Sequence, residues 1–317
     1  MILIVTNRTD YTADFLILRL QKLAIPYVRF NTEDFPFYAT ASTHWKQDRI
    51  RLQKSESTIE LSKVKSVWYR RPESPSFPDD FDIDARDFAG RESREFLLGL
   101  WRCLPCLWVN HPDSIRLAEN KIEQLKRMTS MGLEIPGTVV TNDPELARQF
   151  YESNEGKVVA KTLRQSHGTL GDREYVIYTN PVFGDQLSVF QTVRYSPVIF
   201  QQRVEKASDI RVTVVGSDVF ATEIHSQERD ETRVDWRRDT LSLRHTVHRL
   251  PEHVEQQCLN LVRSYGLVFG ALDLVKTPSS DYIFLELNPN GQWAWIESLT
   301  QQPISAKLIE VLDRGQI

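Results

Sequence analysis

Cysteine is scarce in this sequence, with three residues in 317. Cys103, Cys106 and Cys258 are too few for a disulfide framework, which excludes small disulfide-stabilised domains and suits a reducing cytoplasm. Cys103 and Cys106 have the CxxC spacing of redox and metal sites, but they lie in the apolar stretch LWRCLPCLWV. We interpret them as packing residues, with redox or metal chemistry as the alternative.

Long apolar runs and an excess of one charge are also absent. The N-terminal run at residues 2–5 is too short for a signal-peptide core, and no run approaches the roughly 20 apolar residues of a membrane span. Lys and Arg total 39 and Asp and Glu total 43, a formal net charge of −4. This balance gives no support for nucleic-acid binding. We expect a soluble cytoplasmic protein that binds neither nucleic acid nor membrane.

Glycine is sparse, and the first polar turn, Thr6–Asp10, lacks the GxGxxG of dinucleotide-binding folds. The pattern around that turn still predicts a βαβ start, with strands at 2–5 and 27–30 and a helix between them. Further helices are expected at 84–104, 113–131 and 251–265, and strands at 64–69, 107–110, 157–161, 198–201, 210–215 and 219–224. We predict an α/β protein with domains at 1–111, 112–197 and 198–317.

Two acids interrupt apolar runs near the C-terminus. The segments around Asp273 and Glu286 flank a turn that contains Pro278, which predicts a β-hairpin. Strand alternation places Glu286 and Asn288 on one face, and simple register brings Asp273 near Glu286. Three oxygen ligands on one surface suit Mg²⁺, which takes its remaining oxygens from water and phosphates. The alternative is that both acids pair with arginines.

Several motifs precede this hairpin in a fixed order. They are Lys121, Lys161, the QQRV run at 201–204, the DIR run at 209–211, and finally Asp273 and the ELNPNGQW run from Glu286. The ordered set resembles the ATP-grasp ligases over residues 112–310. The resemblance implies an ATP-grasp fold (α/β, α+β) that binds ATP and Mg²⁺. It also implies a Rossmann-like pre-ATP-grasp domain in the preceding residues.

A closer likeness is to the microviridin-type peptide macrocyclases, or graspetide synthetases. It is carried by the WYRRP run at 68–72 and by the region from DIRVTVVG to VDWRR. These enzymes close ester or amide rings between side chains of a ribosomally made precursor peptide. The resemblance therefore implies a precursor peptide, with leader and core, as the partner. It also implies a homodimer.

The resemblance assigns the nucleotide site to two lysines and one hinge segment. Lys161 would contact the α and β phosphates, and Lys121 would play a related part; the alternative for each is a solvated side chain. Gln202, Arg203 and Val204 would hold adenine, mainly through backbone groups. The glycine-containing loop at 165–171 could cover the phosphates.

Charged residues farther along suggest the remaining roles. By resemblance Asp209 would accept hydrogen bonds from the ribose hydroxyls, and Arg211 would face the phosphates or the acyl group. Arg237 matches a position near the acceptor, where a cation offsets the repulsion between a carboxylate and phosphate. Glu223 and Asp235 are candidate bases for hydroxyl attack. A solvated charge run is the alternative for the loop that holds Arg237 and Asp235.

Arg70, Arg71 and Arg238 are candidates for binding the substrate peptide, with plain surface charge as the alternative for the first two. His245 and His248 have an HxxH spacing, but on a strand they would point to opposite faces, which disfavours a shared metal site.

The predicted activity is ATP-dependent macrocyclisation. ATP would phosphorylate a Glu or Asp side chain of the peptide, and a Thr or Ser hydroxyl or a Lys amine would then displace phosphate. A ligase that adds an amino acid to a carboxylate, a kinase of the same fold and a non-catalytic ATP-binding regulator are the alternatives. The sequence does not specify the ring number, the ester or amide linkage, or the leader motif.

Overall fold

The computed structural model describes residues 1–44, 46, 49–54, 57–164, 167–170 and 173–316. In this described part of the chain, no helix has both the length and the apolar character needed to span a membrane.

The N-terminal domain is built on a parallel sheet of order β2-β1-β6-β7. Its strands are β1 (Ile2–Thr6), β2 (Tyr27–Asn31), β6 (Ser66–Tyr69) and β7 (Leu107–Val109). Alternate residues of β1 face opposite sides: Ile2 and Ile4 pack with helix α1 (Tyr11–Lys22), whereas Leu3 and Val5 pack with helix α2 (Ile83–Arg102). The predicted βαβ start and parallel sheet are confirmed.

A small antiparallel sheet and short 3₁₀ turns also belong to this domain. The sheet has the order β3-β4-β5. These elements are β3 (Ala39–His44), β4 (Arg49–Lys54), β5 (Ser57–Glu60), η1 (Thr32–Asp34) and η3 (Leu61–Lys63).

The single helix predicted at 113–131 is wrong, because the structure has two helices there. They are α3 (Pro112–Ala118) and α4 (Lys121–Ser130). The Oδ1 of Asn120 accepts hydrogen bonds from the N–H groups of Ile122 and Glu123, 3.1 Å each, and so starts the second helix. This break makes Lys121 the first residue of α4.

The central domain contains an antiparallel sheet of order β12-β9-β13-β8 covered by helix α5 (Pro144–Ser153) and the 3₁₀ segment η4 (Gly184–Tyr195). Its strands are β8 (Thr138–Thr141), β9 (Val158–Lys161), β12 (Asn180–Pro181) and β13 (Val198–Gln202). The boundary expected at 197/198 would separate β13 from β8 and β9, the strands with which it pairs. We therefore place the end of this domain after Gln202.

A hairpin extends from the central domain where a phosphate-covering loop was expected. It consists of β10 (His167–Leu170) and β11 (Arg173–Val176). Residues 165–166 and 171, also part of that expectation, lie outside the described residues.

The C-terminal domain is a five-stranded antiparallel sheet of order β16-β15-β14-β17-β18. Its strands are β14 (Ser208–Val215), β15 (Asp218–Ile224), β16 (His245–His248), β17 (Phe269–Lys276) and β18 (Tyr282–Asn288). Its helical elements are η5 (Ser226–Glu228), η6 (Asp230–Thr232), η7 (Trp236–Ser242), α6 (Glu252–Ser264), α7 (Ala294–Thr300) and α8 (Ile304–Arg314). Helix α6 covers one face of the sheet through an apolar core.

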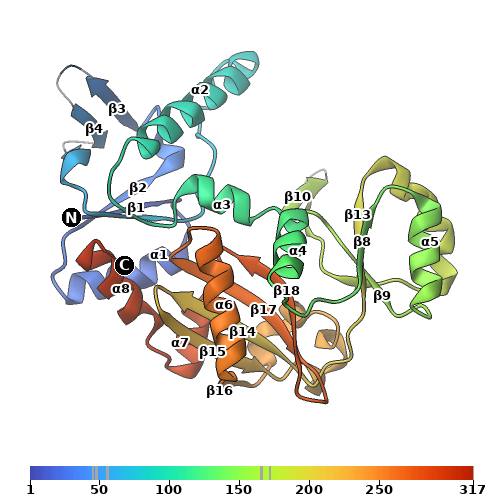
Figure 1. Ribbon diagram of the computed structural model, residues 1–317. Coiled ribbons are helices and arrows are strands. Elements are labelled where there is room, and N and C mark those ends of the chain that lie inside the picture. The colour runs from blue at the N-terminus through green and yellow to red at the C-terminus, as the bar shows by residue number, and fades with distance from the viewer. Residues whose placement is uncertain (45, 47–48, 55–56, 165–166, 171–172, 317) are drawn as a thin grey trace.

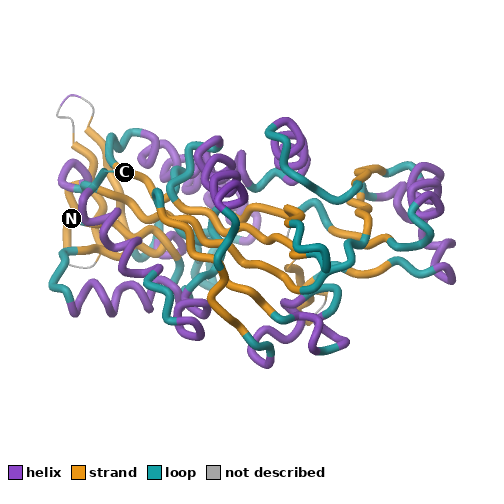
Figure 2. The backbone as a smooth tube through the Cα atoms, turned by 60° about the horizontal axis from the view of Figure 1, so that its bottom comes forward, coloured by secondary structure: helices purple, strands orange, loops and turns teal. Residues whose placement is uncertain are grey.

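The N-terminal and C-terminal domains share a second core. Leu308 and Leu312 of α8 pack in one cluster with Ile2 and Ile4 of β1, and the Ser66 hydroxyl donates to the Leu312 carbonyl at 2.6 Å. The central sheet and α5 lie apart from this body, at the other end of an elongated molecule (Figures 1 and 2). The functional site lies where the central and C-terminal sheets approach each other.

Candidate active site

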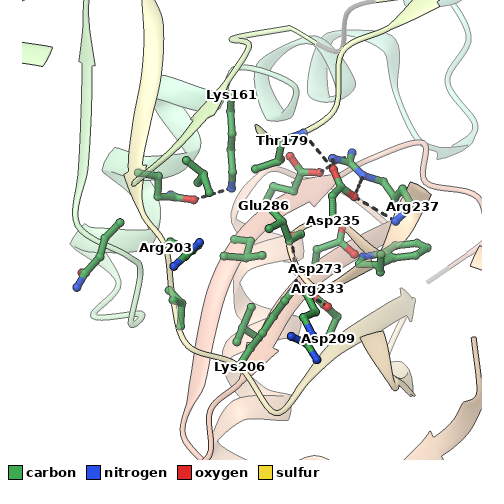
Figure 3. Close-up of a pocket in the computed structure, with 18 of the residues that line it drawn as sticks. Lys161, Thr179, Arg203, Lys206, Asp209, Arg233, Asp235, Arg237, Asp273 and Glu286 are labelled. Carbon is green, nitrogen blue, oxygen red and sulfur yellow. Dashed lines mark hydrogen bonds and ion pairs between the residues drawn. The ribbon is translucent and has the colours of Figure 1, made fainter. Parts of the chain in front are cut away.

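The two acids of the C-terminal hairpin lie opposite each other. Asp273 of β17 is the cross-strand partner of Glu286 of β18, which confirms the predicted hairpin. Partners across a ladder point to the same face of a sheet. Both side chains line one cavity (Figure 3). Leu285, which lies next to a register shift in the hairpin, lines the same cavity.

Asn288, the third expected metal ligand, does not line this cavity. It pairs with Ala271 in the ladder, and its Oδ1 accepts a hydrogen bond from the Asn290 N–H at 2.9 Å. Within the described ranges, no group of three or more His, Cys, Asp or Glu side chains could hold a metal ion. Mg²⁺ bound with phosphates needs only one or two protein carboxylates. Asp273 and Glu286 fit that smaller requirement.

Each carboxylate of this pair has cationic neighbours. Arg211 Nη1 lies 2.9 Å from both oxygens of Asp273, while Lys121 Nζ and Arg237 Nη1 lie 3.4 and 3.9 Å from the Glu286 oxygens. Burial raises the pKa of Asp273 despite Arg211. Burial acts in the same direction on Glu286, but its cationic neighbours outweigh it and lower the pKa. The pairing of these acids with arginines, the alternative to a metal site, is therefore present in this structure.

The cavity lies between the central and C-terminal sheets. Ten of the expected site residues line it: Lys121, Lys161, Gln202, Arg203, Val204, Asp209, Asp235, Arg237, Asp273 and Glu286. The structure thus brings together residues that the sequence separates widely.

Lys161 is held at the end of β9 by a residue that sequence reasoning missed. Its Nζ donates to the Gln201 Oε1 at 2.5 Å, and the Gln201 amide donates to the Thr138 hydroxyl at 3.0 Å. Burial lowers the pKa of Lys161 to about 8. The polar Gln201 inside the apolar run VIFQQ was the available signal, because a buried amide needs partners.

A second residue that sequence reasoning missed, Lys206, forms an ion pair with Asp209. Lys206 Nζ lies 2.9 and 2.7 Å from the two Asp209 oxygens and 3.3 Å from the Val234 carbonyl. Both side chains of this ion pair are almost fully buried, and burial raises the pKa of Asp209. The expected ribose acceptor is therefore already bound to a lysine that itself lines the cavity.

Asp235 joins the charged loop to the central domain. Its carboxylate accepts hydrogen bonds from the N–H, Nε and Nη2 of Arg237 and from the N–H of Thr179, at 2.6 to 3.1 Å (Figure 3). Burial acts to raise the pKa of Asp235, but Arg237 outweighs it and the pKa is lowered. A carboxylate with four donors and a lowered pKa is a poor proton acceptor. This geometry does not support the interpretation of Asp235 as a general base.

Glu223 lies away from the cavity, because its position along β15 alternates to the α6 side of the sheet. Its cross-strand partner is Ile210, a residue of the core that α6 covers. The Glu223 carboxylate accepts from the Ser208 hydroxyl at 2.7 Å and contacts His248 Nδ1 at 3.0 Å and Lys276 Nζ at 3.5 Å. This geometry does not support the expectation that Glu223 is a general base.

The three arginines expected at the peptide occupy different environments. Arg70 is 1% exposed and pairs with Asp10. Contrary to expectation, it therefore does not lie on a peptide-binding surface. Arg71 is exposed. Arg238 Nη2 donates to the Asn180 Oδ1 at 2.6 Å and lies beside the central domain.

The two histidines of the HxxH spacing have separate surroundings. His248 contacts Glu223 and the Tyr282 hydroxyl, whereas the His245 ring packs edge-on against Trp295. They do not form a shared site, as strand alternation predicted.

This fold has a cavity between two sheets, and lysines, arginines and a carboxylate pair line that cavity. Together they are the fold and site of an ATP-grasp ligase. Two sequence profiles match the chain: the MvdD pre-ATP grasp domain over residues 1–116 and the RimK-like ATP-grasp domain over residues 118–312. The chain belongs to the RimK-like ATP-grasp family.

Three relatives illustrate this membership. A Chryseobacterium gregarium RiPP-associated ATP-grasp ligase, solved with ADP and a leader and core peptide, is 31% identical with a TM-score of 0.92, covering 100% of this chain and 97% of that one. The macrocyclase MdnC from Microcystis aeruginosa, solved with precursor peptide MdnA, is 31% identical with a TM-score of 0.90, covering 99% of each chain. A probable alpha-L-glutamate ligase from Mannheimia succiniciproducens is 25% identical over 67% of this chain and 68% of its own length.

Proposed function

We propose that this protein is an ATP-dependent macrocyclase of a ribosomal precursor peptide. It phosphorylates Glu or Asp side chains and closes ester rings with Thr or Ser, or amide rings with Lys. The observation that carries the proposal is the full-length similarity, across both matched domains, to ligases solved with precursor peptides. The cavity supplies the matching chemistry, because its cations and carboxylates suit a nucleotide and a second anion.

The nucleotide would lie between the two sheets. The hinge Gln202–Val204 would hold adenine, and Lys161 and Lys121 would bind phosphate oxygens as point charges. Lys206 lines the same cavity beside Asp209, so this ion pair, rather than Asp209 alone, would face the ribose.

Asp273 and Glu286 would hold Mg²⁺, with Asn288 nearby on the same strand as Glu286. Magnesium, when bound, offsets the negative charge of the phosphates. Arg211 and Arg237, which contact these carboxylates, would orient the γ-phosphate and the peptide carboxylate. Cations at this position reduce the repulsion between two anions that must approach each other.

Two bond changes follow. A carboxylate oxygen of the peptide attacks the γ-phosphorus, the bond to the β-phosphate breaks, and ADP and an acyl phosphate form. The hydroxyl or amine of the same peptide then attacks the acyl carbon and expels phosphate. Holding both groups in one cavity makes the second step intramolecular, which favours it strongly. Among the described cavity residues every carboxylate has a cationic partner, so we assign no general base.

Mass spectrometry tests the proposal. The protein is incubated with ATP, Mg²⁺ and the peptide encoded by a neighbouring short reading frame rich in Thr and Glu or Asp. We expect the loss of one water per ring, with no added mass. An intact peptide mass despite tight leader binding would contradict the proposal.

A second candidate is a ligase that adds an amino acid to a protein or small-molecule carboxylate. The similarity to probable alpha-L-glutamate ligases favours it, since such an enzyme would share the nucleotide site. A mass gain of one amino-acid residue would identify this activity. Release of no phosphate with any peptide would instead favour an ATP-binding regulator.

The remaining features of the partner are also proposals. Arg71 and Arg238 stay candidates for contact with the peptide, and a homodimer stays the expected assembly. Sedimentation velocity with and without peptide measures the assembly directly.

A further inference from the structure

The turn that follows strand β18 is held by side chains of two domains. Its residues are 289–292, directly after the strand that carries Glu286. Arg70 and Asn110, both from the N-terminal domain, donate to this turn, and so does Arg211 of β14. A carbonyl that accepts from a buried side chain has little freedom to move.

The contacts cover four consecutive carbonyl groups. Asn110 Nδ2 donates to the Pro289 carbonyl at 2.9 Å. Arg70 Nη1 lies 3.4 and 3.3 Å from the carbonyls of Asn290 and Gly291. Arg211 Nη2 lies 3.5 Å from the Gln292 carbonyl. The same turn therefore contacts a buried arginine of the N-terminal domain and the arginine that pairs with Asp273.

Arg70 is fixed from its own side as well. Its Nε donates to the Asp10 Oδ2 at 2.8 Å, and both side chains are 2% exposed. Asp10 in turn caps α1 by accepting from the N–H groups of Thr12 and Ala13, at 3.1 and 3.3 Å. Breaking a buried ion pair leaves an uncompensated charge, so Arg70 has one strongly preferred place.

The space around the turn is closed. A Cβ on Gly291 would collide with the Ala271 Cβ and come within 2.6 Å of Arg211 Nη2, so this position admits only glycine. The next residue but one, Trp293, is fully buried and packs edge-on against Phe15 of α1, 5.7 Å between ring centroids. Any shift of the turn would therefore also move Arg211.

We propose that Arg70 is a positioning residue, which through the 289–292 turn holds Arg211 and the Asp273–Glu286 pair in place for phosphoryl transfer. Arg70 thus contributes to the chemical step without itself touching the nucleotide or the peptide. The inference rests on the proposed function for its kinetic part only. The rigidity of the turn can be measured whatever the substrate is.

The test compares Arg70→Lys with Arg102→Lys. Lysine at 70 keeps the charge that compensates Asp10 but lacks the guanidinium fork that reaches the turn. We expect kcat to fall about tenfold, since small misplacements of reacting groups are costly, while KM for the peptide stays unchanged. Arg102, the last residue of α2, also pairs with an aspartate, Asp113, but both side chains are about half exposed, and its variant is expected to match the wild type in kcat and KM.

Hydrogen exchange separates this inference from the proposed function. We expect the amides of residues 291–293 to exchange faster in Arg70→Lys than in Arg102→Lys, with or without peptide. If no peptide is cyclised but this exchange difference is present, the proposed function fails and the coupling stands. Unchanged exchange would overturn the coupling, even with active enzyme.

A double-mutant cycle completes the test. Because both arginines act through one turn, the kcat losses of Arg70→Lys and Arg211→Lys should be less than multiplicative when combined. Multiplicative losses, or a raised peptide KM with unchanged kcat in Arg70→Lys, would overturn the proposal. If Arg70→Lys does not fold, the charge-neutral pair Asp10→Asn with Arg70→Gln removes both buried charges and takes its place.

Discussion

The two faces of the C-terminal sheet are built from the same strands for opposite purposes. On β14, Ile210, Val212 and Val214 face α6 and form an apolar core, whereas Asp209 and Arg211 alternate to the cavity side. The apolar face stabilises the folded state by removing apolar surface from water. The cavity face buries charges, whose burial costs free energy unless they pair with one another or with a ligand. Stability and chemistry are thus separated across the thickness of one sheet.

The largest expected effect is at Glu286, on the cavity face. Glu286→Gln removes the negative charge beside Lys121 and Arg237 without changing size, and we expect kcat to fall about 10²–10³-fold. Steady-state ADP release measures this change. Glu223→Gln is the matched control, because it makes the same replacement on the opposite face and is expected to leave kcat unchanged. Equal losses in both variants would remove the distinction between the faces.

The converse change is at Leu272, which is fully buried on the α6 face. Leu272→Ala removes buried apolar volume, so we expect the free energy of unfolding to fall by about 2–5 kcal/mol. Urea denaturation measures it. Below the unfolding transition kcat should equal that of the wild type. A lost kcat in a fully folded variant would show that this face also determines the chemistry.

The pH dependence of the activity tests the role of Lys161, which lines the cavity. Since burial lowers the pKa of Lys161 to about 8, its ammonium is charged below that pH and becomes neutral as the pH rises through it. We expect kcat/KM for ATP to fall above pH 8, approaching about tenfold for each further unit. Lys161→Arg should abolish this alkaline limb, because guanidinium stays charged. An unchanged limb in that variant would assign the titration to another group.

The smallest expected effect is at Asp235. Asp235→Asn weakens the hold on Arg237, and we expect a loss of about 1 kcal/mol in the chemical step, or about fivefold in kcat. The pH dependence of kcat should stay as in the wild type. Removal of a general base would instead change that pH dependence and abolish most of the activity.

Much of the fold followed from periodicity in the sequence. The parallel N-terminal sheet and the C-terminal hairpin were predicted, including the facing of Asp273 and Glu286, because strand alternation and a short turn constrain register. The break before Lys121 was missed, since the apolar pattern runs across Asn120 and only its capping side chain ends the helix.

The site was less predictable where partners lie far apart in the chain. Arg70 was placed at the surface because a charged residue is usually exposed, and nothing local indicates its pairing with Asp10, 60 residues away. Gln201 and Lys206 were passed over for the same reason: their roles depend on the side chains they hold. Glu223 was the avoidable error, since alternation along β15 already places it on the α6 face.

The central claim is that the cavity face activates a peptide carboxylate as an acyl phosphate. A precursor peptide whose Glu and Asp carboxylates carry a heavy oxygen isotope tests this directly, because the expelled phosphate must retain one carboxylate oxygen. We predict one labelled phosphate for each ring closed, and none from Glu286→Gln. Rings that form with the release of unlabelled phosphate would contradict the account.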